Sequence, residues 1–235
     1  MIPEILDQIP PEAVMYLVNA LAFEAEWSDI YEKHQVRDGK FTKEDGTRQD
    51  VEYMYGSENI YLEDEKATGF IKYYRGGKYA FAAMLPNEGV SVSDYIASLD
   101  GESLNAMLAD SQYATVLTSI PKFEMEYSVE MSEILKGMGM PKAFDPDNAE
   151  FGRLGTSTDG NIYISRVLHK TFISVGEKGT KAGAATVVEV ADQSAVEADP
   201  QEPKQVYLDR PFVYMLVDRE NNIPFFIGTM IDIES

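Results

Sequence analysis

The segment Glu177–Val188, which reads E-K-G-T-K-A-G-A-A-T-V-V, carries the most unusual combination of residues in the chain. It begins with tiny side chains and continues into β-branched ones, which favour strands. A core helix would instead show larger residues at a spacing of 3.6. Small side chains followed by strand formers suit a segment that is exposed in one state and slides between strands in another. On composition alone, a plain connector that contains alanine is the simpler explanation.

Residues suited to enzymatic chemistry are few and scattered. The two histidines, His34 and His169, stand outside any H-E-x-x-H frame, and no G-x-S-x-G nucleophile elbow occurs. The chain has no cysteine, which excludes a thiol nucleophile, a thiolate metal site and a disulfide framework. Its 40 Asp and Glu residues make close carboxylate pairs inevitable, but no spacing singles one pair out. We therefore expect no enzyme, no metal and no cofactor.

The charge balance argues against two classes of partner. Forty acidic residues against 20 basic ones give a net charge of −20, which phosphate backbones and anionic lipids would repel. No apolar run reaches the ~20 residues of a membrane span. The start of the chain, Met1–Glu4, has neither the basic nor the apolar region of a signal peptide. We expect neither a nucleic-acid partner nor a membrane.

Strands dominate the pattern of apolar residues. Ala13–Phe23 is an almost unbroken apolar run that suits a strand buried on both faces, although a buried helix fits its periodicity too. Short helices are predicted over Ser91–Leu99, with Ser93 and Asp94 as capping candidates, and over Glu102–Ala109 and Ser128–Lys136. The other predicted strands are Phe70–Tyr74, Tyr79–Leu85, Tyr113–Tyr127, Ile162–Val175, Phe212–Val217 and Pro224–Ile231. Because βαβ alternation is missing, the predicted class is α+β.

Several motifs together resemble the serpin family of serine protease inhibitors. The string E-K-G-T-x-A-x-A-A-T that starts at Glu177 is similar to the mobile hinge of that family. Further resemblances follow in family order along the whole chain, at Val18–Phe23 with Trp27, Met84–Gly89, Ile120–Phe123, His169-Lys170, Arg210–Phe212 and Pro224–Gly228. The chain departs from the family pattern at Phe23–Ala25 and at Ile30-Tyr31, which flank the tryptophan.

The resemblance implies the α+β serpin fold: mixed and antiparallel sheets, a few helices and an exposed reactive-centre loop. Residues 1–235 would form a single serpin domain with the loop at 177–205. A protease attacks the loop and forms its acyl-enzyme, and the cut loop then inserts as a new strand that traps the protease. The implied hinge comprises Glu177, Gly179, Thr180, Ala182, Gly183, Ala184, Ala185 and Thr186. Four small residues alternate on one face of the extended hinge, which favours an inhibitory member: Thr180, Ala182, Ala184 and Thr186.

The resemblance also assigns residues outside the hinge. Trp27, Lys122 and Glu177 would form the breach at the top of the sheet, with an ion pair between Lys122 and Glu177. Asn19 and His169 would hydrogen-bond in the shutter. The family's usual interval from Glu177 places the bait bond at Gln193-Ser194, and the alternative Val190-Ala191 would suit an elastase-like pocket.

Met1–Leu6 resembles the linker that enters the family's central strand, so we expect Met1 to be an internal residue of a longer protein. A chain incomplete at its N-terminus would expose an apolar sheet face and would need the missing part or another chain. The family also implies an extracellular, secreted protein, and a loose resemblance to gut-bacterial serpins implies a bacterial one. Two functions remain. One is a suicide inhibitor of an elastase-like or subtilisin-like serine protease. The other is a non-inhibitory binding or structural module, or an inactive truncated serpin.

Overall fold

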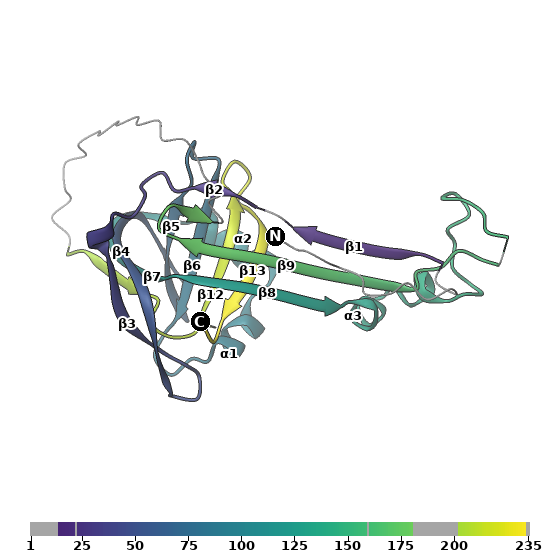
Figure 1. The fold of residues 1–235 in the computed structure, drawn as a ribbon, viewed down its shortest axis with the longest axis horizontal. Helices are drawn as coiled ribbons and strands as arrows, with labels where there is room; N and C mark the ends of the chain where they lie inside the picture. Colours follow the sequence, from purple (N-terminus) through teal and green to yellow (C-terminus); the bar gives the residue numbers. More distant parts are fainter. Residues whose placement is uncertain (1–13, 22, 159, 181–201, 234–235) are drawn as a thin grey trace. The chain divides into compact units, whose positions relative to one another are not determined.

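The computed structural model describes residues 14–233 apart from residues 22, 159 and 181–201. The chain divides into two compact units. Unit 1 comprises Met1–Phe23 and Met125–Ile173, and unit 2 comprises Glu24–Glu124 and Ser174–Ser235. The division falls inside two long strands, β8 (Phe123–Glu130) and β9 (Arg166–Gly176), drawn in Figure 1.

Unit 2 is built on an eight-stranded sheet in the order β11-β7-β4-β5-β6-β12-β13, with β3 beside β4. Every pairing is antiparallel except that of β11 with β7. The strands are β3 (Val36–Thr42), β4 (Arg48–Glu63), β5 (Ala67–Tyr73), β6 (Tyr79–Pro86), β7 (Gln112–Pro121), β11 (Lys204–Tyr207), β12 (Phe212–Asp218) and β13 (Ile223–Met230). A short 3-10 helix, η1 (Lys33–Gln35), precedes β3.

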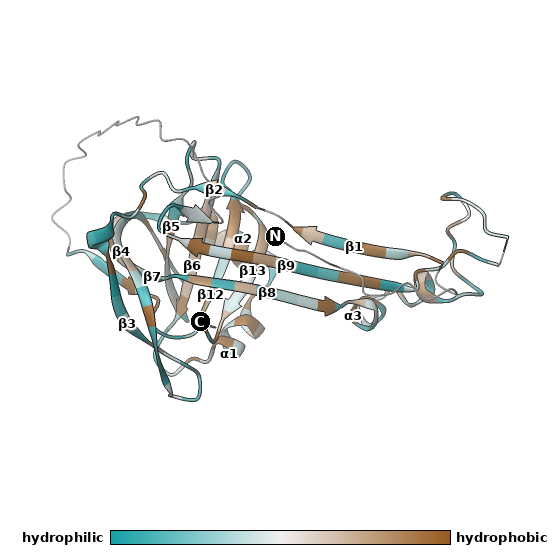
Figure 2. Cartoon of the chain, in the orientation of Figure 1, coloured by the Kyte–Doolittle hydropathy of each residue, from teal (hydrophilic) through white to brown (hydrophobic). Residues whose placement is uncertain are grey.

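The core of unit 2 lies on β6 and β12, which are paired with each other and buried along almost their whole length. Both strands are continuous apolar runs because both of their faces are covered. Figure 2 shows hydrophobic residues along the strands of this sheet. Two helices, α1 (Val92–Ser98) and α2 (Gly101–Ala109), contribute buried side chains to the same apolar cluster.

The helices of unit 2 begin at capping residues. The backbone N–H of Asp94 donates to Ser91 Oγ at 3.0 Å, so Ser91 is the N-cap of α1. The prediction that Ser93 or Asp94 caps this helix is therefore wrong, because both lie within its first turn. In α2, the N–H of Ser103 donates to Asp100 at 2.8 Å. Each cap satisfies a backbone donor that has no partner inside its helix.

In unit 1, β1 (Tyr16–Leu21) runs parallel to β9 and pairs with it through six residues, from Tyr16 opposite Arg166 to Leu21 opposite Thr171. Strand β8 also pairs with β9. The helix predicted over Ser128–Lys136 begins four residues later than expected, at Ser132. Strand β8 continues to Glu130, whose carboxylate accepts a 3.0 Å bond from the Ser132 N–H and so starts α3 (Ser132–Gly137). A 3-10 turn, η2 (Pro141–Phe144), follows.

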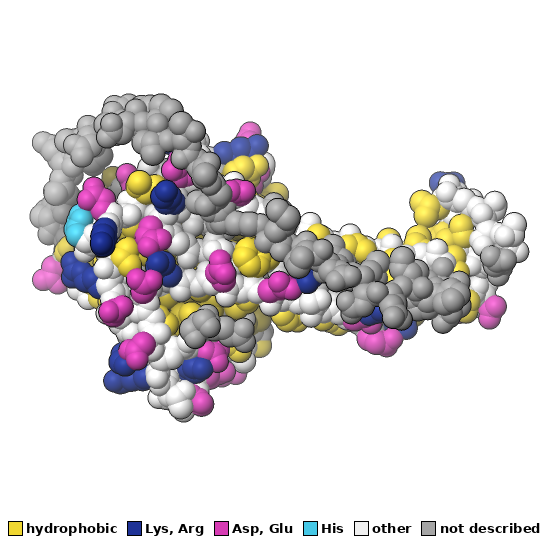
Figure 3. Space-filling view, viewed as in Figure 1, with side chains coloured by type: hydrophobic (Ala, Val, Ile, Leu, Met, Phe, Trp, Pro, Cys, Tyr) yellow, Lys and Arg dark blue, Asp and Glu magenta, His cyan; other side chains and the backbone are white. Residues whose placement is uncertain are grey.

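Strand β1 is a strand as predicted, but the expectation that both of its faces are buried is wrong. Leu17 and Val18 are 41% and 45% exposed, and consecutive strand residues point to opposite faces. The described residues therefore cover neither face of β1. Figure 3 shows hydrophobic side chains at the surface of unit 1, where Tyr127 and Leu154 are also exposed.

The last residues of β9 belong to unit 2. There Val175 and Gly176 pair with the short antiparallel strand β10 (Gly179–Thr180). Strand β10 also pairs, again antiparallel, with β2 (Ala25–Glu26). This small arrangement surrounds the first residues of the predicted hinge.

Candidate functional site: the hinge after β9

The turn between β9 and β10 is held by three hydrogen bonds to three consecutive carbonyls. The indole Nε1 of Trp27 donates to Gly176 O, the backbone N–H of Tyr31 donates to Glu177 O, and the backbone N–H of Trp27 donates to Lys178 O, each at 2.9 Å. We call Trp27 and Tyr31 together the hinge anchor. The anchor satisfies the backbone acceptors of a turn that would otherwise leave them to solvent.

Trp27 is itself held by aromatic contacts. It is 1% exposed, and its ring stacks on Tyr74 with centroids 4.5 Å apart and planes 10° apart. The edge of Phe81 approaches from another side at 6.0 Å. The Tyr74 hydroxyl is hydrogen-bonded to the Thr180 hydroxyl, and burial raises the pKa of Tyr74. The first residue of β10 that points into the structure is thus bonded to the ring that supports Trp27.

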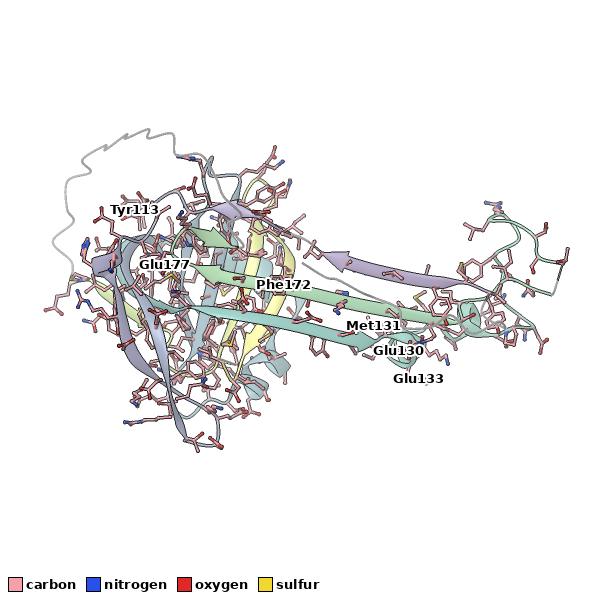
Figure 4. All side chains as sticks on the ribbon, viewed as in Figure 1. Tyr113, Glu130, Met131, Glu133, Phe172 and Glu177 are labelled. Carbon is pink, nitrogen blue, oxygen red and sulfur yellow. The ribbon has the colours of Figure 1, made fainter. Side chains whose placement is uncertain are left out.

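An ion pair joins the predicted breach residues. Lys122 Nζ lies 2.8 Å from Glu177 Oε1 and 2.9 Å from Glu52 Oε2. Figure 4 shows Glu177 just beyond the end of β9. The hydrogen bond from Lys122 lowers the pKa of Glu177, and the same bond raises the pKa of Lys122. Because the three side chains are 29% to 56% exposed, water screens much of this attraction.

Gly179 marks the tightest backbone approach at the site. Its φ is 154°, and a Cβ built there would lie 2.1 Å from Ala25 O and 2.8 Å from Glu26 Cα. Any side chain at this position would collide with the backbone of β2. Glycine thus permits β10 to lie between β2 and the end of β9.

A buried ion pair lies behind the hinge anchor, and the sequence analysis missed it. Lys72 Nζ donates to Glu58 Oε1 at 2.8 Å, with the two side chains 4% and 12% exposed. Burial raises the pKa of Glu58, and the charge of Lys72 offsets part of that shift. The available signal was a lysine inside the apolar strand run Phe70–Tyr74, where a charge needs a buried partner.

The predicted shutter residues lie opposite each other. Asn19 of β1 and His169 of β9 are partners in the register of the two strands. Asn19 is exposed and His169 is half-buried. The hydrogen bond between their side chains stays a prediction.

Most of the predicted loop lies outside the described residues. This holds for the hinge residues Ala182, Gly183, Ala184, Ala185 and Thr186, and for both bait-bond candidates, Gln193-Ser194 and Val190-Ala191. Of the predicted hinge, the structure describes Glu177, Gly179 and Thr180.

Two features of the described residues concern metal ions and membranes. Within that part of the chain, no group of three or more His, Cys, Asp or Glu residues is placed to hold a metal ion. No helix among the described residues is long and apolar enough to cross a membrane.

The chain belongs to the serpin family, because the family model described as Serpin (serine protease inhibitor) matches residues 1–233. An uncharacterised serpin-like protein of Thermococcus kodakarensis is 30% identical over 232 residues, covering 98% of this chain and 53% of that protein. The thermophilic serpin tengpin in its native state is 47% identical with a TM-score of 0.88, covering 98% of this chain and 58% of that one. In its latent state the identity is 44% and the TM-score 0.74, with coverage of 90% and 55%.

A more distant structure shares the fold. Human thyroxine-binding globulin, complexed with thyroxine, is 24% identical with a TM-score of 0.81, covering 98% of this chain and 59% of that one. The chain thus spans a little over half the length of the relatives it matches. The predicted α+β serpin fold is confirmed, and serpins are generally protease inhibitors rather than enzymes.

Proposed function

We propose that the protein inhibits serine proteases as a suicide substrate. The protease cleaves the segment that follows Thr180, and the cut segment then inserts between β1 and β9. One observation carries this proposal. Gly179 and Thr180 already run antiparallel to the end of β9, which is the direction that a new strand beside β9 would take.

The pairing of β1 with β9 supports insertion energetically. The two strands are now joined by one parallel ladder of six residue pairs. A strand inserted between them, antiparallel to both, would replace that ladder with two antiparallel ladders, which are slightly more stable per residue. Insertion therefore gains backbone hydrogen bonds, and this gain is the energy that would displace the attached protease.

The alternation of side chains in the hinge fits the burial pattern of β9. Thr180 pairs with Val175, and the same register continued along β9 would bring Ala182 opposite Ile173 and Ala184 opposite Thr171. Val175, Ile173 and Thr171 form the buried side of β9, at 2%, 3% and 9% exposure. The small hinge residues would thus enter the covered face of the sheet.

The charged residues of the hinge would fall on the other face. If the same register continued beyond the hinge, Glu189 would come opposite the exposed Arg166, a partner of opposite charge. Cross-strand pairs of opposite charge stabilise antiparallel strands modestly. Of the two candidate bait bonds, Val190-Ala191 would suit an elastase-like pocket, while Gln193-Ser194 follows from the family's usual interval.

The test is incubation of the naturally expressed protein with a panel of elastase-like and subtilisin-like serine proteases. We expect a covalent protein–protease complex that survives SDS denaturation. In the inserted strand, Ala184→Arg would place a charge on the buried face, so this variant should be cleaved by the protease without trapping it. Ala185→Arg would place the same charge on the opposite face, so this variant should still trap the protease. Clean cleavage of the unaltered protein without a complex would identify a non-inhibitory or inactive member and overturn the proposal.

A further inference from the structure

Lys72 is a buried cation in a strand whose other residues are mostly apolar. Strand β5 reads A-T-G-F-I-K-Y, and Lys72 is 3% exposed within it. Its ammonium donates to Glu58 of the neighbouring strand β4. A buried charge is costly, and replacing such a pair with uncharged residues is often neutral or stabilising. Fold stability alone is therefore a weak explanation for this pair.

The ammonium of Lys72 also lies over two aromatic rings. Lys72 Nζ is 4.5 Å from the ring centroid of Tyr31 and 5.5 Å from that of Trp27. Both distances are within the range of cation–π attraction, which is strongest where water is excluded. Tyr31 is 6% exposed, so its ring faces the ammonium where most water is excluded. The ring of Tyr31 is thus held by packing and by this cation.

The two rings under the ammonium are those of the hinge anchor. Their residues bind the carbonyls of Gly176, Glu177 and Lys178. We propose that Lys72, fixed by Glu58, is a positioning residue that holds Trp27 and Tyr31 in place and thereby sets how readily the hinge leaves its anchor. The consequence for inhibition rests on the proposed function, because hinge release is the step that precedes strand insertion.

The backbone amides of Trp27 and Tyr31 give a direct readout, since each donates one of the three anchor bonds. The test compares the unaltered chain with the double variant Lys72→Met/Glu58→Gln, which removes both charges and leaves neither orphaned. Glu58 and Lys72 line a cavity of about 370 Å³, so the amide introduced at position 58 can be hydrated. We expect hydrogen exchange at these two amides to be about tenfold faster, with exchange in the β6–β12 core unchanged.

Tryptophan fluorescence supplies a second readout, because Trp27 is the only tryptophan of the chain. Its emission maximum should shift in the double variant, because the Lys72 ammonium no longer lies over the indole ring. Lys78→Met is the matched control: it removes an exposed lysine whose Nζ lies 5.4 Å from the ring centroid of Tyr79 rather than over a ring of the hinge anchor. This control should leave both readouts unchanged. If the double variant fails to fold, Glu58→Gln alone should speed exchange at the same amides by about threefold.

The outcomes separate the positioning role from a general structural one. Unchanged exchange and emission would overturn the proposal, and so would an increase spread evenly over the core of unit 2. Both readouts are independent of protease inhibition. If the unaltered protein traps no protease, the proposed function fails, while faster exchange confined to the anchor amides would still support the role of Lys72.

Discussion

Gly179→Ala tests whether the close contact between β10 and β2 holds the hinge in place. The added Cβ would lie 2.1 Å from Ala25 O and 2.8 Å from Glu26 Cα, far inside any real carbon contact. Because the obstructing atoms belong to backbone, they cannot rotate away. Strand β10 would have to retreat by on the order of 1 Å, which lengthens its hydrogen bonds beyond their normal range.

The cost follows from the contacts that such a shift disrupts. Two residue pairs join β10 to β2, and each lost hydrogen bond costs about 1 kcal/mol. The positive φ of Gly179 adds about 1–3 kcal/mol of backbone strain for alanine. We therefore expect a loss of about 3–5 kcal/mol, which for a chain of this size lowers the melting temperature by roughly 6–20 °C. Differential scanning calorimetry measures this directly.

Gly176→Ala is the matched control, three residues away in the same turn. A Cβ at Gly176 meets no atom within 4 Å, and its backbone is not in the glycine-favouring region. This variant should melt within about 2 °C of the unaltered chain. Equal melting temperatures for the Gly179→Ala and Gly176→Ala variants would refute the argument that β10 is held against β2 by close backbone contact.

Two further predictions concern polar contacts of the hinge. Glu177→Gln should cost no more than about 1 kcal/mol near neutral pH, because the pair with Lys122 is partly exposed. The hydrogen bond from Lys122 lowers the pKa of Glu177, so the stabilisation that Glu177 provides is present above its ordinary pKa of 4.5 and is lost as the pH falls through the lowered pKa. In denaturant titrations, the unfolding free energies of the unaltered protein and the Glu177→Gln variant should therefore converge in acid. A difference in unfolding free energy that persists in acid would contradict the ion pair. Tyr74→Phe leaves the buried Thr180 hydroxyl without its hydrogen-bond partner and should lower the free energy of unfolding by about 1–3 kcal/mol. The double variant Tyr74→Phe/Thr180→Val should lose less stability than the sum of the two single variants. Strictly additive losses in thermal melts would argue against the hydrogen bond.

Most strands were accessible from the sequence because their signals are local. The paired apolar runs near the C-terminus became β12 and β13, and Gly76-Gly77 marks the connection between β5 and β6. The first residues of the helices were predicted less accurately. The sequence around Ser91 offers several capping residues, and only the backbone conformation decides that Ser91 is used. At Ser128, strand β8 simply continues to Glu130, since pairing with β9 overrides the local preference.

Burial and contacts that depend on residues far apart in the sequence could not be predicted from the local pattern of apolar and polar residues. The apolar content of β1 predicted burial, but burial depends on what covers a strand, and the described residues leave Leu17 and Val18 exposed. The ion pair of Lys72 with Glu58 joins residues on two strands. Its placement over the rings of Trp27 and Tyr31 follows from tertiary packing alone. A lysine in an apolar strand was the one local sign of it.

Strand insertion between β1 and β9 is the central claim, and the melting temperature of the loop-cleaved protein tests it most directly. The naturally expressed protein is cleaved within residues 190–194 by a protease that it does not trap, and both forms are then heated under the same conditions. Insertion adds two antiparallel ladders where one parallel ladder stood, so the cleaved form should melt well above the intact form. A cleaved form that melts at or below the temperature of the intact protein would contradict the claim.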